Sequence, residues 1–292
     1  MSEQIKNRDE RFDKISPTAL MVAYRRSLSD IPYSSDILEE LKSDSLLDKV
    51  DDSLLRPDLA PQIEARYKIV DLYLHNSGAK QILELASGLS PRGIIMSENQ
   101  SINYVELDLP AMLDEKIKLI NRLRTKDKIS DMPNLKFSPG NVLDMDDLLN
   151  ATSGFDPSQK LAIINEGLMR YLTMDERATL AKNIHKLLTI FGGIWITPDI
   201  SLKRIFENEE IRDAEHTQKV SNMTGIDIAS NRFEDKQHAQ YFFEGFGFRV
   251  EQHSWLEVVQ NLSSPEIVGI SNDEVISMNE LPTLFVMSAI AD

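Results

Sequence analysis

Short apolar runs alternate with longer amphipathic stretches along the chain from Lys80 onward. Five of these runs lie between polar or turn-forming segments, which is typical of strands buried on both faces of a parallel sheet. The pattern predicts strands at 81–85, 103–107, 135–138, 161–165 and 194–198. Two later runs, 248–252 and 283–288, are candidates for the last strands of the same sheet.

The amphipathic stretches between the runs predict helices. The clearest helix follows Thr173, which has the spacing of a capping box with Glu176. Its apolar stripe consists of Leu180, Ile184, Leu187 and Leu188. Gly192 and Gly193 are expected to end it, because glycine readily adopts the left-handed backbone that follows a last helical turn.

Residues 15–76 show helical patterns only. Pro17 after Ser16 predicts one helix start, and a second short helix is expected at 36–41. A third helix has apolar residues at helical spacing and ends before Gly78, its expected C-cap. The apolar positions are Ile63, Tyr67, Val70 and Leu74. We therefore expect a helical cap at 16–76 on an α/β core at 77–292.

Strands and helices that alternate at this spacing predict an α/β fold with a doubly wound sheet. In such sheets ligands bind at the carboxyl ends of the strands, so the loops there are the candidate sites. The region near 200–240 interrupts the alternation and is expected to form a lid. Its aromatic and methionine side chains fit either a lid over an apolar ligand or ordinary core packing. They are Met223, Phe233, Tyr241, Phe242 and Phe243.

Composition and charge narrow the possible functions. The 292-residue chain has a formal net charge of −15 and a pI near 4.8, which argues against general binding to nucleic acids or anionic membranes. It contains no cysteine, which excludes disulfides, a cysteine nucleophile and thiolate metal sites. Residues 1–15 lack the apolar core of a signal peptide and are expected to be flexible. No run is long enough to span a membrane, so we expect a cytoplasmic protein.

The loop after the first strand is built from small residues and leads into a helix. Against the dinucleotide template G-x-G-x-x-G, the three glycine positions hold Ala86, Gly88 and Pro91. With only the middle glycine present, a pyrophosphate site is disfavoured, and the loop suits a nucleoside ligand without phosphates. A plain tight turn is the alternative interpretation.

The second strand leads to a carboxylate suited to ribose. Asp108 stands 20 positions after Gly88, the usual offset of an acidic residue that accepts hydrogen bonds from ribose hydroxyls. Glu106 shares its face of the strand and is a second candidate, of which we favour Asp108. The alternative role for Asp108 is a cap on the helix that Pro110 begins.

The third and fourth strands also lead to polar residues. Asn141 follows the third strand at a position suited to an adenine edge, and Glu166 follows the fourth beside Gly167. A carboxylate directly after an apolar strand is costly to bury without a partner. Glu166 therefore faces either a cationic ligand, such as a sulfonium, or a neighbouring backbone group.

Three motifs together resemble the leucine carboxyl methyltransferase family, which includes O-methyltransferases of polyketide synthesis and belongs to the class I S-adenosylmethionine-dependent methyltransferases. They are I-L-E-L-A-S-G-L-S-P-R at 82–92, Y-V-E-L-D-L-P at 104–110 and N-E-G-L-M-R-Y-L-T at 165–173. The resemblance covers the chain from about Ser16 onward. It implies a Rossmann-like sheet of seven mainly parallel strands, with S-adenosylmethionine as cofactor and S-adenosylhomocysteine as product.

The resemblance also implies roles for single residues. Arg66 would meet the methionine carboxylate of the cofactor, Asp108 its ribose, and Glu166 the region of its amino group and methyl centre. Tyr171 and Arg170 would face the methyl acceptor. The implied contacts along the tail and adenine of the cofactor are Glu84, Ala86, Gly88, Asn141 and Val142.

The chain departs from the family pattern at three places. The first loop has Ala86, Ser87, Ser90 and Pro91 where the family more often has Leu-Gly-Ala-Gly followed by Asp-Thr-Arg. Asn141 stands where aspartate is usual. Arg170 stands where an apolar residue is common, and it is either an acceptor contact or a surface substitution.

Methyl transfer from a sulfonium is an in-line displacement, in which the protein contributes mainly by placing the acceptor oxygen. An ionised carboxylate needs no base, only a group to orient it, for which Arg170, Arg92 and Tyr171 are candidates. A phenol or alcohol needs a general base, and histidine is the first residue type to consider. His185 lies in an amphipathic helix beside Lys186, where exposure is the expected state.

The sequence thus predicts an O-methyltransferase that acts on a carboxylate or hydroxyl of a small, polyketide-like acceptor. We expect no metal, because the spacings typical of histidine ligand pairs are absent. We also expect no nucleic-acid or membrane partner, and the sequence indicates no oligomeric state. The alternatives are a non-catalytic relative that binds the cofactor or a partner and, less favoured, an NAD(P)-dependent oxidoreductase.

Overall fold

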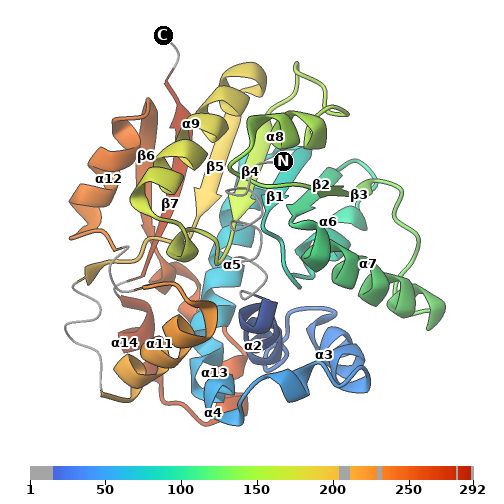
Figure 1. Ribbon diagram of the computed structural model, residues 1–292, viewed down its shortest axis with the longest axis vertical. Coiled ribbons are helices and arrows are strands. Elements are labelled where there is room, and N and C mark those ends of the chain that lie inside the picture. Colours follow the sequence, from blue (N-terminus) through green and yellow to red (C-terminus); the bar gives the residue numbers. More distant parts are fainter. Residues whose placement is uncertain (1–15, 204–210, 229–231, 281, 291–292) are drawn as a thin grey trace.

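A seven-stranded sheet forms the centre of the computed structural model, which describes residues 16–203, 211–228, 232–280 and 282–290. The strands are β1 (Gln81–Leu85), β2 (Asn103–Asp108), β3 (Leu135–Pro139), β4 (Leu161–Asn165), β5 (Gly193–Thr197), β6 (Phe248–Ser254) and β7 (Thr283–Ala289). Their order in the sheet is β3-β2-β1-β4-β5-β7-β6 (Figure 1). The first five strands are parallel, and β7 is antiparallel to both β5 and β6. The expected mainly parallel sheet of seven strands is confirmed.

The predicted strand bounds agree with the structure to within two residues. β1 and β4 match, β2, β3 and β7 are one residue longer than predicted, and β6 is two residues longer. The fifth strand was predicted at 194–198 but begins at Gly193 and ends before Pro198. A proline lacks the N–H that would continue the ladder. Gly193 fits because, at its φ of 107°, a Cβ atom would lie only 1.9 Å from the carbonyl oxygen of Leu161.

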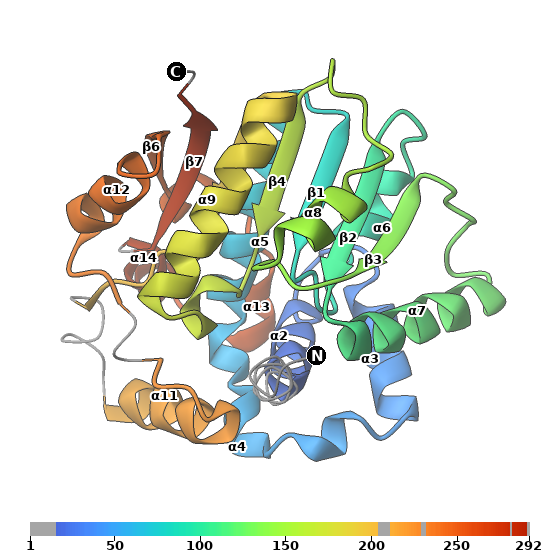
Figure 2. The same ribbon diagram turned by 45° about the horizontal axis from the view of Figure 1, so that its top comes forward.

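Helices cover both faces of the sheet and the region beyond its carboxyl ends. The α-helices of the described residues are α2 (Ser16–Arg26), α3 (Ser34–Ser43), α4 (Asp52–Leu55), α5 (Ala60–Ser77), α6 (Arg92–Ser97), α7 (Pro110–Thr125), α8 (Met145–Ala151), α9 (Met174–Phe191), α11 (Ile211–Thr224), α12 (Lys236–Glu244), α13 (Ser264–Val268) and α14 (Asn272–Glu280). Short 3-10 helices are η1 (Leu47–Lys49), η2 (Pro57–Leu59), η3 (Met169–Tyr171) and η4 (Trp255–Asn261). Figure 2 shows α8 and α9 in front of the sheet and α5 behind it, as the doubly wound prediction requires.

Alternate residues of the central strands β1, β2, β4, β5 and β7 contribute to two separate cores. Ile82 and Tyr104 pack with α5, α6 and α7, whereas Leu83 and Val105 pack with α8, α9 and α12. Successive side chains of a strand point to opposite faces, which explains this division. The strands read as nearly continuous apolar runs because both faces are buried.

The helical signals at the start of the chain are confirmed. α2 and α3 lie where the two short helices were predicted, and α5 ends at Gly78, which has a φ of 64°. Figure 1 shows α2, α3 and α4 together beyond the carboxyl ends of the parallel strands, with α11 and α13 beside them. The division into a cap at 16–76 and a core at 77–292 stays a prediction. The segment 1–15, expected to be flexible, lies outside the described residues.

The capping box predicted at the start of α9 is present. The side chain of Thr173 accepts from the backbone N–H of Glu176, and the carboxylate of Glu176 accepts from the backbone N–H of Thr173. α9 ends at Phe191, and Gly192 adopts a φ of 65°. Among the described helices, none is long and apolar enough to cross a membrane.

Candidate active site

A cavity opens at the carboxyl ends of β1, β2, β3 and β4. It contains about 1160 Å³ of space free of protein atoms, counting its open mouth. Its walls are the loops that follow these strands, the segment around η3, the start of α7 and one face of α2. The loop residues lie at 86–90, 108–109, 140–143 and 166–168. The cavity therefore occupies the place where a doubly wound sheet binds its ligand.

The loop after β1 forms one wall of this cavity with left-handed backbone. Ala86 has a φ of 52° and Gly88 a φ of 50°. The N–H of Ala86 donates to the carbonyl of Leu107, which ties the loop to the end of β2. Left-handed backbone costs an alanine more than a glycine, so the contact with β2 holds Ala86 in a conformation it would otherwise avoid.

Asp108 lies at the end of β2 and lines the cavity, with 8% of the residue exposed. Its carboxylate accepts the backbone N–H groups of Gly88 and Leu109 at 2.7 and 2.8 Å. Burial raises the pKa of Asp108 above its ordinary value, although both hydrogen bonds favour the charged form. The N-cap of α7 is Leu109, and it makes no side-chain cap hydrogen bond. The geometry therefore favours a ligand contact over the capping role for Asp108.

Glu106, the second ribose candidate, lies outside the cavity wall. It is fully buried and forms an ion pair with Lys116 of α7. Burial raises the pKa of Glu106 to about 7, against the charge of Lys116. Of the two carboxylates on this face of β2, only Asp108 lines the cavity.

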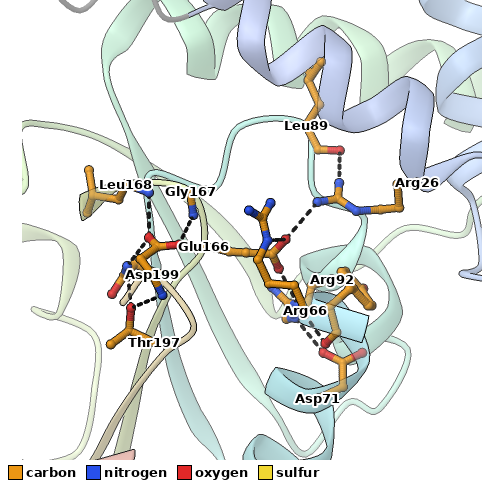
Figure 3. Close-up of polar contacts among 12 residues, drawn as sticks. Arg26, Arg66, Asp71, Leu89, Arg92, Glu166, Gly167, Leu168, Thr197 and Asp199 are labelled. Carbon is orange, nitrogen blue, oxygen red and sulfur yellow. Dashed lines mark hydrogen bonds and ion pairs between the residues drawn. The ribbon is translucent and has the colours of Figure 1, made fainter. Parts of the chain in front are cut away.

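Glu166 lies among three guanidinium groups (Figure 3). Arg66 Nε donates to its Oε1 at 3.0 Å, a terminal nitrogen of Arg92 donates to its Oε2 at 3.0 Å, and Arg26 approaches Oε1 to 3.4 Å. Burial alone would raise the pKa of Glu166, but these three positive charges lower it to about 2. Glu166 is thus ionised near neutral pH at the cavity wall, where side chains rather than neighbouring backbone groups hold it.

Arg26 also lines this cavity, although it was not among the predicted site residues. It comes from the last turn of α2, where a basic residue also suits the helix dipole, so its sequence position carried no specific signal. Only 4% of Arg26 is exposed, and its Nε has no hydrogen-bond partner in the described part of the chain. Its contacts with Leu89 and Glu166 are both long, at 3.4 Å.

Arg92 was one of three candidates to orient a carboxylate acceptor, and the structure places it behind the cavity wall. Arg92 is 1% exposed and does not line the cavity. It donates to Asp71 at 2.6 Å and to Glu84 at 2.9 Å, besides Glu166. Glu84 likewise lies behind the wall, where it accepts from the hydroxyl of Tyr104, so a direct ligand contact of Glu84 is not supported. Arg92 therefore supports Glu166 from behind, and Glu84 holds Arg92 in place.

The other residues implied for the cofactor line the cavity. Arg66 uses only Nε for Glu166, and its two terminal nitrogens make no hydrogen bond within the described residues. Asn141 and Val142 line the opposite side, after β3. The Asn141 side-chain oxygen accepts the N–H of Leu143, and its backbone N–H donates to Asp147, so this loop is fixed by its own contacts.

Arg170 and Tyr171 line the cavity from η3. The Arg170 guanidinium lies 5.9 Å from the centre of the Tyr171 ring, and in the described residues it forms no ion pair with an acid. Burial and the charges of Arg170, Arg56 and Arg66 lower the pKa of Arg25 to about 9, which shows how many cations gather at this end. The sheet thus brings the two predicted acceptor residues beside the predicted cofactor residues.

The candidate general base His185 and the described aromatic residues of the region near 200–240 lie outside the cavity wall. Among the described residues no histidine lines the cavity, and His185 packs edge-on against Phe248 at 5.3 Å. Phe233 and Phe243 belong to the core that contains Trp195, which confirms the core interpretation for these two rings. Tyr241 is 63% exposed. Within the described residues, no three His, Asp or Glu side chains come together to hold a metal ion.

Comparison with protein families identifies the family of the chain. The model of the leucine carboxyl methyltransferase family matches residues 17–185, more than half of the chain. This confirms the resemblance drawn from the three sequence motifs.

Two relatives match about three fifths of the chain. One, from Mycolicibacterium smegmatis, is provisionally named an S-adenosyl-L-methionine-dependent methyltransferase and is 26% identical over 198 residues, 59% of this chain and 63% of that protein. A protein of Mycobacterium leprae with a similar provisional name is 25% identical over 177 residues, 60% of this chain and 56% of that protein. The match therefore spans less than two thirds of the length of these relatives.

Solved structures with the same fold include a DUF574 family protein from Streptomyces avermitilis, with a TM-score of 0.58 and 14% identity over 94% of this chain and 97% of that one. The S-adenosylmethionine-dependent methyltransferase SibL has a TM-score of 0.51 and 11% identity, over 90% of this chain and 70% of that one. At these identities the likeness shows the fold alone.

Proposed function

Because the chain belongs to the leucine carboxyl methyltransferase family, we propose that it binds S-adenosylmethionine in the cavity and transfers the methyl group to an oxygen atom of a small molecule. The observation that carries the proposal is the pairing of two acidic residues in one cavity. Asp108 lies at the end of β2, and Glu166, ionised and surrounded by arginines, follows β4. S-adenosylmethionine would supply an electrophilic methyl group on a sulfonium.

The unused polar atoms of the cavity fit the amino-acid end of this cofactor. The Nε of Arg26 is buried without a hydrogen-bond partner in the described residues, and Arg66 has two free terminal nitrogens there. Guanidinium groups bind carboxylates well because they present several N–H donors in a plane. We assign the methionine carboxylate to Arg66 and Arg26, and the ammonium group and sulfonium to the neighbourhood of Glu166.

The nucleoside end fits the opposite wall. Each oxygen of the Asp108 carboxylate accepts one backbone N–H, which leaves lone pairs for ribose hydroxyls. Ala86 and Gly88 let the backbone approach the ligand, and Asn141 and Val142 would contact the adenine. The absent glycines of the dinucleotide template continue to disfavour NAD(P).

The acceptor end favours a group that is already ionised. Glu166, with a pKa of about 2, is a poor proton acceptor near neutral pH, and the described wall contains no histidine. A carboxylate needs no base, and Arg170 can orient it while Tyr171 bounds its position. We therefore favour a carboxylate over a hydroxyl as the methylated group. A polyketide-like skeleton for the acceptor stays a prediction.

The first experiment is calorimetric titration of the purified chain with S-adenosylhomocysteine, with NAD as the comparison ligand. We expect micromolar binding of S-adenosylhomocysteine alone. Asp108→Ala should weaken this binding at least tenfold, whereas Asp114→Ala, an exposed residue six positions later on α7, should leave it unchanged. A folded chain that binds neither ligand would contradict the proposal and favour a non-catalytic relative.

The second experiment measures transfer of a labelled methyl group to a panel of small carboxylates and phenols. Arg170→Gln should raise the KM for carboxylates at least tenfold with little change in cofactor affinity. Preference for phenols, with no effect of Arg170→Gln, would contradict the carboxylate assignment.

A further inference from the structure

Asp199, two residues after β5, receives hydrogen bonds from three consecutive backbone amides of another loop. Its Oδ1 accepts the N–H of Gly167 at 2.7 Å, and its Oδ2 accepts the N–H groups of Leu168 and Met169 at 2.7 and 3.2 Å. The Asn165 amide also donates to Oδ2, at 2.8 Å. One carboxylate thus satisfies three donors that would otherwise need water or a ligand.

Arg177 of α9 donates a further hydrogen bond to this loop. Arg177 is 1% exposed, and its Nε donates to the carbonyl of Met169 at 2.9 Å. Burial lowers the pKa of Arg177 to about 10, although the charge of Asp199 acts in the opposite direction. The amide of Asn165 is itself fixed, because its oxygen accepts from Trp195 and its nitrogen donates to Thr197. Two charged side chains, Asp199 and Arg177, therefore bind the backbone of 167–169.

This backbone lies between the proposed cofactor side of the site, with Glu166, and the proposed acceptor side, with Arg170 and Tyr171. Glu166 at its start is held independently by three guanidiniums, so its position does not depend on Asp199 alone. Arg170 and Tyr171 at its end have no comparable side-chain anchor within the described residues. Gly167 has a φ of 82°, a left-handed conformation that glycine adopts without steric cost.

We propose that Asp199 is a positioning residue that places Arg170 and Tyr171 against the methyl acceptor, through its hydrogen bonds to the backbone of 167–169. The proposal rests on the proposed function for its kinetic consequence, but the hydrogen bonds themselves are independent of any ligand. Loss of the Asp199 carboxylate loosens the acceptor wall more than the cofactor wall.

Two variants test this at the level of the backbone. Asp199→Asn keeps the size but replaces one acceptor by an amide that cannot accept from the N–H groups. Asp199→Ala leaves a gap in which formate can take the place of the carboxylate. Amide hydrogen exchange at 167–169 should accelerate at least tenfold in both variants, and formate at 100 mM should slow it again in Asp199→Ala only. The matched control is Asp235→Asn, an exposed aspartate that accepts the backbone N–H of His238.

Kinetic measurements distinguish a specific effect on acceptor positioning from a general loss of structure, which would affect cofactor binding equally. In Asp199→Asn we expect kcat/KM for a carboxylate acceptor to fall at least tenfold, while the Kd for S-adenosylhomocysteine changes less than threefold. Formate should restore part of the turnover of Asp199→Ala. Equal losses in cofactor affinity and acceptor kinetics, or no rescue, would overturn the positioning role.

The outcomes also distinguish this proposal from the proposed function. Unchanged exchange at 167–169 overturns the positioning role even in an active enzyme. If the unmodified chain binds no S-adenosylhomocysteine, the proposed function fails and the acceptor role of Asp199 fails with it, whatever the exchange experiment shows. If Asp199→Asn does not fold, Asp199→Ala assayed in formate provides the same comparison.

Discussion

Two buried carboxyl groups of this molecule have pKa values shifted in opposite directions. Glu106, inside the sheet on β2, has one cationic partner, Lys116, and its pKa rises to about 7 because of burial. Glu166, at the cavity wall after β4, has three guanidinium partners, and its pKa falls to about 2 in spite of burial. The side chains of both are at most 5% exposed, so burial does not explain the difference.

The number and type of partners decide the outcome. Burial penalises the charged form of any carboxyl, and a single ammonium offsets only part of this penalty. Three guanidiniums, two of which donate at 3.0 Å, more than offset it at Glu166. The ion pair of Glu106 and Lys116 is therefore a buried structural contact away from the cavity. The Glu166 cluster, in contrast, keeps charged groups at the cavity wall, where a ligand can contact them.

The largest expected effect comes from Glu166→Gln. Removal of this charge leaves three buried guanidiniums around a neutral amide, and breaking such a cluster costs about 3–5 kcal/mol of unfolding free energy. Urea denaturation at pH 7 measures the loss. The control is Glu115→Gln, which removes an exposed carboxylate paired with Lys118 and should cost less than about 1 kcal/mol. Equal effects of the two variants would contradict the central role of Glu166.

Lys116→Met should have a smaller effect that depends on pH. At pH 8 the variant leaves Glu106 without its cation, and we expect a loss of about 3 kcal/mol. At pH 5.5 Glu106 can take up a proton, so the loss should be clearly smaller. The double variant Glu106→Gln/Lys116→Met should show little pH dependence. Urea denaturation of the three proteins at both pH values checks this, and a pH-independent loss in Lys116→Met would be inconsistent with the raised pKa.

The pH dependence of the unmodified chain should contain contributions of opposite sign from the two carboxyls. The raised pKa of Glu106 means that the folded state holds a proton more tightly, so its contribution falls as pH rises from 4.5 to about 7. The lowered pKa of Glu166 means that its contribution is present above pH 4.5 and is lost as pH falls toward 2. We expect roughly 1–3 kcal/mol from Glu106.

Denaturation of the unmodified chain and Glu106→Gln, from pH 3 to 8, isolates this contribution. The difference in unfolding free energy between the two proteins should change between pH 4.5 and 7 and stay level below that range. A constant difference would show that Glu106 titrates normally.

The smallest expected effect is that of Tyr67→Phe. The guanidinium carbons of Arg92 and Arg26 lie 4.1 and 5.3 Å from the centre of the Tyr67 ring. Its buried hydroxyl has no hydrogen-bond partner in the described residues, so removing it should change the unfolding free energy by less than about 1 kcal/mol. Tyr67→Leu, which removes the ring face from both cations, should cost more. Thermal denaturation compares the two, and the reverse order would assign the stabilisation to the hydroxyl.

The fold was largely predictable from local signals. Apolar runs marked the seven strands, and Thr173 with Glu176 marked the start of α9, because strand burial and helix capping depend on residues close in sequence. The end of β5 was missed by one residue because an apolar run does not show which N–H groups the ladder uses. The order β5-β7-β6 depends on contacts between distant segments, which periodicity does not encode.

The site was predictable only in part. Asp108 and Glu166 were selected because each lies at the end of an apolar strand run, and both line the cavity. Arg26 and Asp199 were missed because their roles depend on partners 140 residues away in one case and about 30 in the other. Arg92 was misassigned because a basic residue after a glycine loop looks accessible, whereas the fold encloses it between Asp71, Glu84 and Glu166.

Only 5% of the Glu166 side chain is exposed, so dissolved ions have little access to the charges around it. At physiological ionic strength, salt screens exposed charges beyond about 8 Å but acts much less on buried ones. Added salt should therefore weaken surface pairs such as Lys118 with Glu115, while the field inside the cavity persists. A small ligand with a carboxylate and an ammonium group would be retained almost as well in concentrated salt as in dilute buffer.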